Sequence, residues 1–241
     1  MEYKTSLDIF RNYFEHNLHK ARLTMEKSEH HNQPFITVSR LAGAGEINFP
    51  ERLINYLNEA DNIQGNPWMY FDKDILDIVL KEHSLPKEIS KFMPEKKISE
   101  FQDVIEQLFG LHPNEHSLIT KISKTILHLS HLGNVVLVGR GSNIITANCK
   151  NGLHLRLIDS LEKRVANIQD FFKLGKTEAM KLVQTQDKQR EDYVRKYFSK
   201  DINNPCLYSL IINFSHIRTE DAVELISEHM LKTGKLLYIN Q

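Results

Sequence analysis

The segment from Phe35 to Arg52, FITVSRLAGAGEINFPER, places an apolar β-branched run directly before a glycine-containing loop and the start of an amphipathic helix. A strand, a tight glycine loop and a helix in this order are typical of phosphate-binding loops, in which backbone N–H groups cradle phosphate. The run from Phe35 to Val38 is the predicted strand, and Gly43 and Gly45 mark the loop. This order predicts a buried strand in a parallel sheet, with a ligand site at its carboxyl end.

The side chains of a standard phosphate-binding loop are missing from this segment. In the pattern G-x-x-x-x-G-K-[ST], the lysine reaches the β/γ oxygens and the hydroxyl group holds Mg²⁺. Counting back from Gly45, the first glycine position holds Arg40, the lysine position holds Glu46 and the hydroxyl position holds Ile47. A unit charge pair at about 4 Å and an effective dielectric constant of about 20 is worth ~4 kcal/mol, so a glutamate facing the phosphates would weaken binding strongly. The architecture predicts a nucleotide site, while these side chains argue against an ordinary one.

Composition favours a cytoplasmic protein with a substantial core. The chain has 241 residues, with 31 basic and 31 acidic side chains. This balance gives no electrostatic reason to expect nucleic acid or a membrane as the main partner. Cys149 and Cys206 form no CxxC spacing, which suits a reducing compartment. No apolar run approaches the ~18 residues of a membrane span, and the N-terminus has no signal-peptide core.

Helical and apolar segments alternate along the chain. Predicted helices cover 5–27, 52–60, 72–83, 98–109, 114–132, 160–174, 177–199 and a segment capped by Thr219. Further predicted strands cover 134–139, 152–159 and 207–214. Strands separated by helices predict a parallel, doubly wound α/β sheet. The polar run at 26–33 separates the first helix, so we expect a helical extension over 1–33 and one domain over 34–241. The extension is a candidate dimerisation or partner-binding element, with packing on the core as the alternative.

Three groups of residues are candidates for binding chemistry. Residues 39–45 form either a phosphate nest or an ordinary tight turn. Gly139-Arg140-Gly141 follows a predicted strand, where a guanidinium fork suits a phosphate or, alternatively, a carboxylate at the sheet edge. Asp187 and Arg190 share a helix face with two tyrosines, and the alternative is an i,i+3 surface ion pair.

Together these segments resemble the cytidylate-kinase-like branch of the nucleoside monophosphate kinases. The resemblance covers about Phe35 to Met230, and its most specific part is DKxRxxY downstream of a GRG strand end. The segments that carry it are SRLAGAG at 39–45, YFDK at 70–73, VVLVGRGSN at 135–143, LHLRLIDSLEKRV at 153–165, GKTEAMKLVQTQDKQREDYVRKYF at 175–198 and INFSHIRTEDAVELI at 212–226.

The resemblance implies a P-loop kinase-like three-layer α/β fold and ATP-dependent phosphorylation of CMP or dCMP through Mg²⁺, with no metal ligands assigned in the protein. Such a transfer depends on positioning and charge stabilisation, which an arginine-rich site provides. The residues implied at the donor nucleotide are Ser39, Arg40, Gly43, Ala44 and Gly45. Those implied at the acceptor are Asp72, Arg140, Asp187 and Arg190. The implied catalytic arginines are Arg140, Arg164 and Arg190.

Two departures from the family pattern support a second hypothesis. Cytidylate kinases proper carry Gly-Lys-Gly-Thr/Ser after the Gly-Ala, where this chain has Gly45-Glu46-Ile47-Asn48. Relatives carry further lid arginines where this chain has Val165-Ala166-Asn167, and Arg40, Lys173 and Lys176 are candidate substitutes. The alternative is a catalytically silent nucleotide-binding or regulatory protein that keeps the monophosphate site. Phosphorylation of another small molecule by the same scaffold is a third hypothesis.

The remaining motifs favour structural roles. The 12 histidines include the i,i+3 pair His128 and His131, but no HExxH spacing, so no metal site is predicted. Ser142 lies in no G-x-S-x-G elbow, which gives a hydrolase triad no support. Trp68 and Tyr70 are expected to pack beside Phe71 rather than to stack a base.

Overall fold

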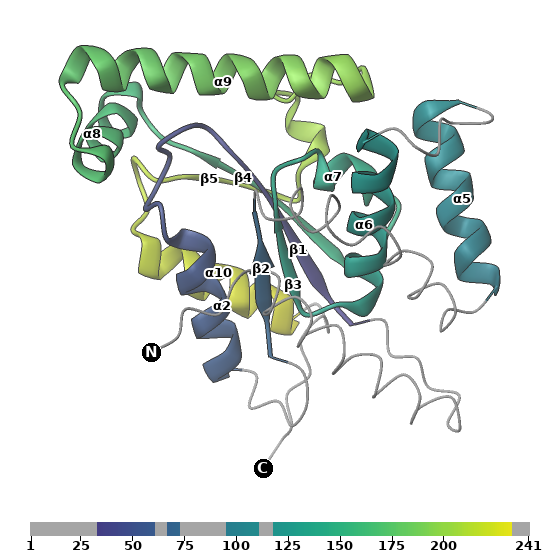
Figure 1. The fold of residues 1–241 in the computed structure, drawn as a ribbon. Coiled ribbons are helices and arrows are strands. Elements are labelled where there is room, and N and C mark those ends of the chain that lie inside the picture. The colour runs from purple at the N-terminus through teal and green to yellow at the C-terminus, as the bar shows by residue number, and fades with distance from the viewer. Residues whose placement is uncertain (1–32, 61–66, 73–94, 111–117, 233–241) are drawn as a thin grey trace, which may run out of the picture.

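The computed structural model shows five parallel strands in one sheet with helices on both faces (Figure 1). The structure describes residues 33–60, 67–72, 95–110 and 118–232. The strands lie in the order β2-β3-β1-β4-β5. Their bounds are Phe35–Arg40 for β1, Met69–Phe71 for β2, Val135–Val138 for β3, Gly152–Ile158 for β4 and Leu210–Asn213 for β5. This arrangement confirms the predicted α/β fold, with the glycine loop following the central strand.

Successive residues of the central strands pack against opposite helix layers. Phe35 belongs to one buried cluster and Ile36 to the other, and Val135 and Val136 divide in the same way. Because helices cover both faces, β3 is continuously apolar, whereas β4 alternates leucines with His154 and Arg156. The parallel register brings the carboxyl ends of β1, β3 and β4 to the same edge of the sheet. That edge carries the candidate site.

The helices form two layers around the sheet. Helices α2 (Phe49–Ala60) and α10 (Thr219–Lys232) cover one face. Helix α6 (Leu118–Leu132) and the short α7 (Ser142–Ile145) cover the other, and α5 (Glu95–Phe109) packs outside α6 (Figure 1). The result is the three-layer arrangement that the family resemblance implies.

A helical hairpin lies across the carboxyl edge of the sheet. It consists of α8 (Leu161–Phe172) and the long α9 (Lys176–Phe198), which runs along the top of Figure 1. Its two helices share a small apolar cluster with Ala42 of the glycine loop; the hairpin members of the cluster are Val165, Ile168, Ala179 and Val183. The hairpin therefore packs directly on the loop that follows β1.

The elements differ from the predictions at a few places. The predicted strand at 207–214 is shorter, because Pro205–Leu207 forms a 3₁₀ turn (η1) with the Asn204 side chain accepting from the N–H of Cys206. Strand β2 and helix α7 were not predicted, and both are too short for periodicity to show. Trp68 is buried, and its backbone N–H and C=O are bound by the Asn58 amide. The expected packing of Trp68 and Tyr70 beside Phe71 is wrong, because both belong to the core cluster on the other face of the sheet from Phe71.

Two predicted helices, at 5–27 and 72–83, lie outside the described residues, so the proposed extension stays a prediction. Of the helices that the structure describes, none combines the length and apolar character needed to cross a membrane.

Candidate functional site

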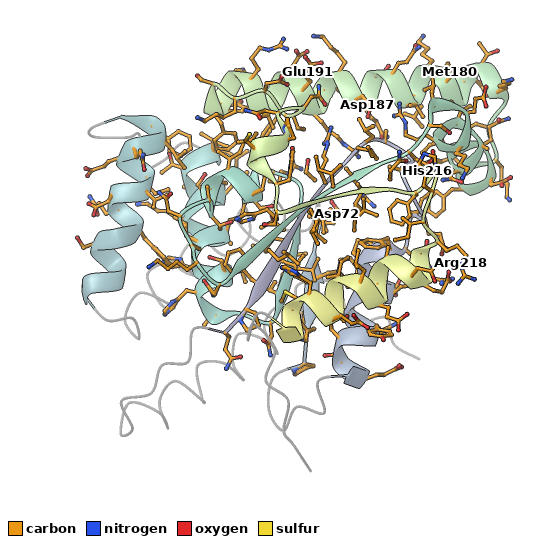
Figure 2. The ribbon with its side chains drawn as sticks, turned by 180° about the vertical axis from the view of Figure 1, so that it is seen from behind. Asp72, Met180, Asp187, Glu191, His216 and Arg218 are labelled. Carbon is orange, nitrogen blue, oxygen red and sulfur yellow. The ribbon has the colours of Figure 1, made fainter. Side chains whose placement is uncertain are left out.

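A cavity of about 690 Å³ opens at the carboxyl edge of the sheet, beneath the α8–α9 hairpin. Its walls come from the ends of β1, β2 and β3, from the last turns of α8 and from one face of α9. Figure 2 shows Asp187 between α9 and this edge of the sheet, with Asp72 nearer the strand ends. This position agrees with the rule that ligands of parallel α/β sheets bind outside the carboxyl ends of the strands.

The glycine loop has a backbone conformation that other residues adopt only under strain. Gly43 has φ +73° and Gly45 has φ +64°. A Cβ atom on Gly43 would lie 2.5 Å from the carbonyl oxygen of Arg164, and one on Gly45 would lie 2.6 Å from the Phe214 ring. The left-handed conformation and the close approach both require glycine at these two positions.

Several backbone N–H groups of the loop have no partner in the described part of the chain. The N–H of Ala42 donates to Asp187 Oδ1 at 2.7 Å. The N–H groups of Gly43, Gly45 and Glu46 have no acceptor among the described residues. Unpaired N–H groups gathered in a loop of left-handed residues form a site for an anion.

Helix α8 holds the carbonyl groups of the loop. Arg164 Nη1 donates to the carbonyl of Ala42 at 3.3 Å, and Asn167 Nδ2 donates to the carbonyl of Gly45 at 3.1 Å. The C=O and N–H of one trans peptide point in opposite directions. Binding these carbonyls to α8 therefore turns the N–H groups of Gly43 and Glu46 away from α8. Asn167, which departs from the family pattern, thus shapes the loop.

Asp187 fixes the loop to both helices of the hairpin. Its Oδ2 lies 2.5 Å from Arg164 Nη1, while its Oδ1 accepts from the loop. The side chains are 10% exposed for Arg164 and 23% for Asp187, so the pair is largely shielded from solvent. The alternative of an i,i+3 surface pair between Asp187 and Arg190 is wrong, because Arg190 donates instead to the carbonyl of Arg40 at 2.6 Å.

The other end of the cavity is cationic. Arg40, Arg140 and Arg190 line it, and Asp72 is the one described lining residue with a carboxylate. Burial and the neighbouring Arg40 lower the pKa of Arg190 to about 10, so the guanidinium group stays charged at neutral pH. Arg40 is bound to Asp72 at 2.9 Å. The Arg140 side chain makes no ion pair or hydrogen bond with the described residues, and its φ of +54° is left-handed.

A further buried arginine, Arg156, binds Ser39, which lines the cavity. Arg156 on β4 is 4% exposed, and its Nη1 donates to Ser39 Oγ at 2.8 Å. Its Nη2 donates to Asn203 Oδ1 at 3.2 Å, and burial lowers its pKa. The sequence prediction missed this residue. The available signal was a charged side chain inside the apolar strand LHLRLI, since arginine is almost never fully buried without a partner.

Glu46 does not face the cavity. Its Oε2 lies 3.0 Å from Arg52 Nε on α2, and Arg52 also pairs with Glu220 at 2.5 Å. Glu46 is absent from the residues that line the cavity, whereas Ile47 lines it with an alkyl side chain. The repulsion expected from a glutamate in the lysine position is therefore directed away from the site.

The described residues do not build a magnesium site of their own. Mg²⁺ is usually held by one or two carboxylates, by water and by substrate phosphates. Oδ2 of the Asp72 carboxylate is bound by Arg40, and Ile47 has no side-chain oxygen. The described residues also include no group of three or more histidine, cysteine, aspartate or glutamate side chains that could hold a metal ion.

The predicted site residues divide into two sets. Those that line the cavity are Ser39, Arg40, Gly43, Ala44, Asp72, Arg140 and Arg190. Those that hold or form the loop without lining the cavity are Gly45, Arg164 and Asp187. The structure adds lining residues that the sequence prediction left out, Phe171, Phe172, Gln186 and Gln189 among them.

Comparisons with known proteins agree with this architecture. The solved structure of an uncharacterized protein from Eubacterium ventriosum ATCC 27560 matches with a TM-score of 0.56 and 17% identity, over 83% of this chain and 99% of that chain. At this identity the likeness shows the fold alone. A search of curated proteins found no significant match.

A family model described as "Cytidylate kinase-like family" matches residues 67–216, which is more than half of the chain. The matched region includes Arg140, the α8–α9 hairpin and Asp187, and it begins after the glycine loop. This match confirms the resemblance found in the sequence. The chain belongs to the cytidylate kinase-like family, whose members are nucleotide kinase-like proteins.

Proposed function

We propose that this chain transfers the γ-phosphoryl group of ATP, supplied with Mg²⁺, to CMP or dCMP. One observation carries the proposal: a single cavity joins a loop with N–H groups that lack acceptors among the described residues to Arg140, which has no ion-pair or hydrogen-bond partner among them. The first feature suits the phosphates of a donor, and the second suits the phosphate of an acceptor.

Charge at the cationic end supports an acceptor monophosphate. Three guanidinium groups line this end against the one described carboxylate, Asp72. Asp72 already balances Arg40. A phosphate monoester, with close to two negative charges at neutral pH, would balance Arg140 and Arg190. Arginine forks bind phosphate oxygens in pairs, which also fixes the orientation of the acceptor.

The chemistry of the transfer suits a site without a nucleophilic side chain. Phosphoryl transfer requires that donor and acceptor oxygens are held in line and that the charge on the transferred group is stabilised. The glycine loop, Arg140 and Arg190 all border this one cavity. We assign Mg²⁺ no protein ligand and derive no step from it.

A second candidate is binding without transfer. Ile47 at the hydroxyl position and the pairing of Asp72 Oδ2 with Arg40 favour it, because Ile47 has no side-chain oxygen and the Asp72 charge is already balanced by a guanidinium group. In this case the chain binds CMP or dCMP without phosphorylating it and acts as a nucleotide-binding or regulatory protein. Residence in the cytoplasm and self-association through the N-terminal helix stay predictions under both candidates.

Turnover and binding assays separate the two candidates. We expect the full-length protein to form ADP from ATP–Mg²⁺ in the presence of CMP or dCMP, and Arg140→Ala to abolish this dependence on the acceptor. An active relative serves as the positive control. Absence of ADP with every monophosphate tested, together with calorimetric binding of CMP but not of ATP–Mg²⁺, would establish the second candidate.

A further inference from the structure

The cavity wall beside the glycine loop is aromatic. Phe171 and Phe172 form the last turn of α8, with side chains that are 58% and 48% exposed. Their rings meet edge to face with centroids 4.8 Å apart. Together with Ile168 and Ile47 they line the cavity. Two adjacent exposed phenylalanines are uncommon on a protein surface without a binding role, and here they border a cavity.

This aromatic wall lies next to the loop and far from Arg140. A Cβ atom on Gly43 would lie 3.0 Å from Ile168 Cγ1, which places the α8 face against the loop. Helix α9 packs on α8 at Val183 and lines the opposite end of the cavity at Tyr193. Ten residues of α-helix span about 15 Å, so the α8 part of the wall lies roughly that far from Tyr193. Ile47, at the other edge of the wall, lies beside Arg40, whose Nη1 donates to the Ile47 carbonyl at 3.4 Å.

The chemistry of the wall selects its occupant. Charged phosphates gain nothing from two phenyl rings and an isoleucine, whereas a flat aromatic group gains both apolar burial and stacking. An occupant with phosphates on the N–H groups of Gly43 and Gly45 would extend its uncharged end over this wall. A nucleotide has this combination of a charged end and a flat aromatic end.

We propose that Phe171 and Phe172 stack the base of the nucleotide whose phosphates lie on the 41–48 loop. The inference rests on the proposed function and adds the determinant of donor binding to it. Base stacking on aromatic side chains is tolerant of base identity, because every base has a π-face. The four described residues of the wall carry no hydrogen-bonding side-chain group, so ATP and GTP are expected to bind with similar affinity.

Calorimetry with three probes tests this inference on the full-length protein. The probes are ATP, GTP and tripolyphosphate, which carries the phosphates without a base. The double substitution Phe171→Leu and Phe172→Leu keeps apolar volume but removes both rings. We expect it to weaken ATP and GTP binding by roughly tenfold or more, in line with the known range for base stacking, and to leave tripolyphosphate binding unchanged. Phe171→Tyr and Phe172→Tyr should retain nucleotide affinity.

Leu161→Ala is the matched control, because Leu161 is a 41% exposed apolar side chain on the same helix that does not line the cavity. Equal ATP binding by the double variant and the parent overturns the inference while leaving the proposed function intact. Equal loss of ATP and tripolyphosphate also overturns it, because the rings would then act on the loop. A parent protein that binds no nucleoside triphosphate refutes the inference and the donor half of the proposed function together.

Sedimentation of the same variants examines self-association through the phenylalanine pair. If the parent is a dimer, and the double variant is a monomer with unchanged ATP affinity, the pair is an interface between copies of this chain and the inference is wrong.

Discussion

The carboxyl ends of β1 and β3 border the same cavity and prepare it in opposite ways. After β1, the polar side chains around the loop hydrogen-bond to the loop backbone: Arg164, Asn167 and Asp187 bind its carbonyl or N–H groups. After β3, three consecutive residues have positive φ, and the turn leaves the Arg140 side chain without a described partner. One strand end offers backbone N–H groups, and the other offers a guanidinium group.

The two halves of the site should therefore respond to different substitutions. The β1 loop depends on side chains from two distant helices, so changes in those helices should unfold it. The β3 turn closes on itself through the N–H of Ser142 and the carbonyl of Gly139, so among the described residues nothing in the turn depends on the Arg140 side chain. Stability should therefore respond mainly to the β1 side, and acceptor affinity mainly to Arg140.

The largest expected effect follows removal of the carboxylate beneath the loop. Asp187→Ala leaves the nearly buried Arg164 without its partner and the Ala42 N–H without an acceptor. Breaking such a pair from one side typically costs about 3–5 kcal/mol of unfolding free energy. Urea denaturation measures it. Asp192→Ala, which removes an exposed partner of Lys188 on the same helix, should cost less than about 1 kcal/mol. Equal losses would show that Asp187 does not hold the loop.

Alanine in place of one glycine at each strand end should destabilise the fold to different extents. Gly43→Ala and Gly139→Ala both place a Cβ at a φ above +70°. The new Cβ would meet the Arg164 carbonyl at 2.5 Å in the first case and open space in the second. We expect a loss of about 3 kcal/mol for Gly43→Ala and of about 1–2 kcal/mol for Gly139→Ala. Thermal unfolding of both variants checks the order, and a reversed order contradicts the comparison.

Arg140→Gly should separate binding from stability. The left-handed φ of +54° costs about 1 kcal/mol for a residue with a Cβ, so glycine is expected to stabilise the fold by up to that amount. Losing charge-assisted hydrogen bonds to a phosphate should weaken CMP binding by about 1.5–3 kcal/mol. Arg140→Lys keeps the charge and the strained backbone, so its CMP affinity should lie between those of the parent and of Arg140→Gly. Calorimetry with CMP and denaturant unfolding of the same preparation measure the two effects. If Arg140→Gly loses stability and keeps its CMP affinity, Arg140 does not bind the acceptor phosphate.

The smallest effect is expected at the position that the sequence marks as most damaging. Glu46→Gln removes a charge that pairs with Arg52 outside the cavity, at a side chain that is 42% exposed. We expect ATP affinity to change by less than about threefold and stability by less than about 1 kcal/mol. Arg52→Gln would free Glu46 and should lower ATP affinity more than Glu46→Gln does. A large gain in ATP binding by Glu46→Gln would mean that the carboxylate faces the phosphates.

Local features of the chain were sufficient to predict the architecture. The sequence predicted β1 as the strand before the glycine loop, and apolar runs predicted β3, β4 and part of the segment that forms β5. The family resemblance agrees with the family model that matches residues 67–216. Glycines at 43, 45, 139 and 141 also predicted the two turns, because a left-handed backbone conformation is a property of the residue itself. The cluster of arginines at the cavity was expected from the same segments.

The sequence did not predict which groups individual side chains bind. Asp187 and Arg190 are three residues apart, yet the first binds Ala42 and Arg164 and the second binds the carbonyl of Arg40, up to 150 positions away. The direction of Glu46 depends on Arg52, and the wall of Phe171 and Phe172 depends on how α8 packs over the loop.

Periodicity and backbone conformation are encoded by neighbours in the chain, and they determined the sheet, its helices and the two glycine turns. The partners of charged and aromatic side chains depend on which groups the fold brings within a few ångströms of them. The tertiary structure therefore decided which arginine has no partner among the described residues, which carboxylate turns away from the cavity and which rings border it.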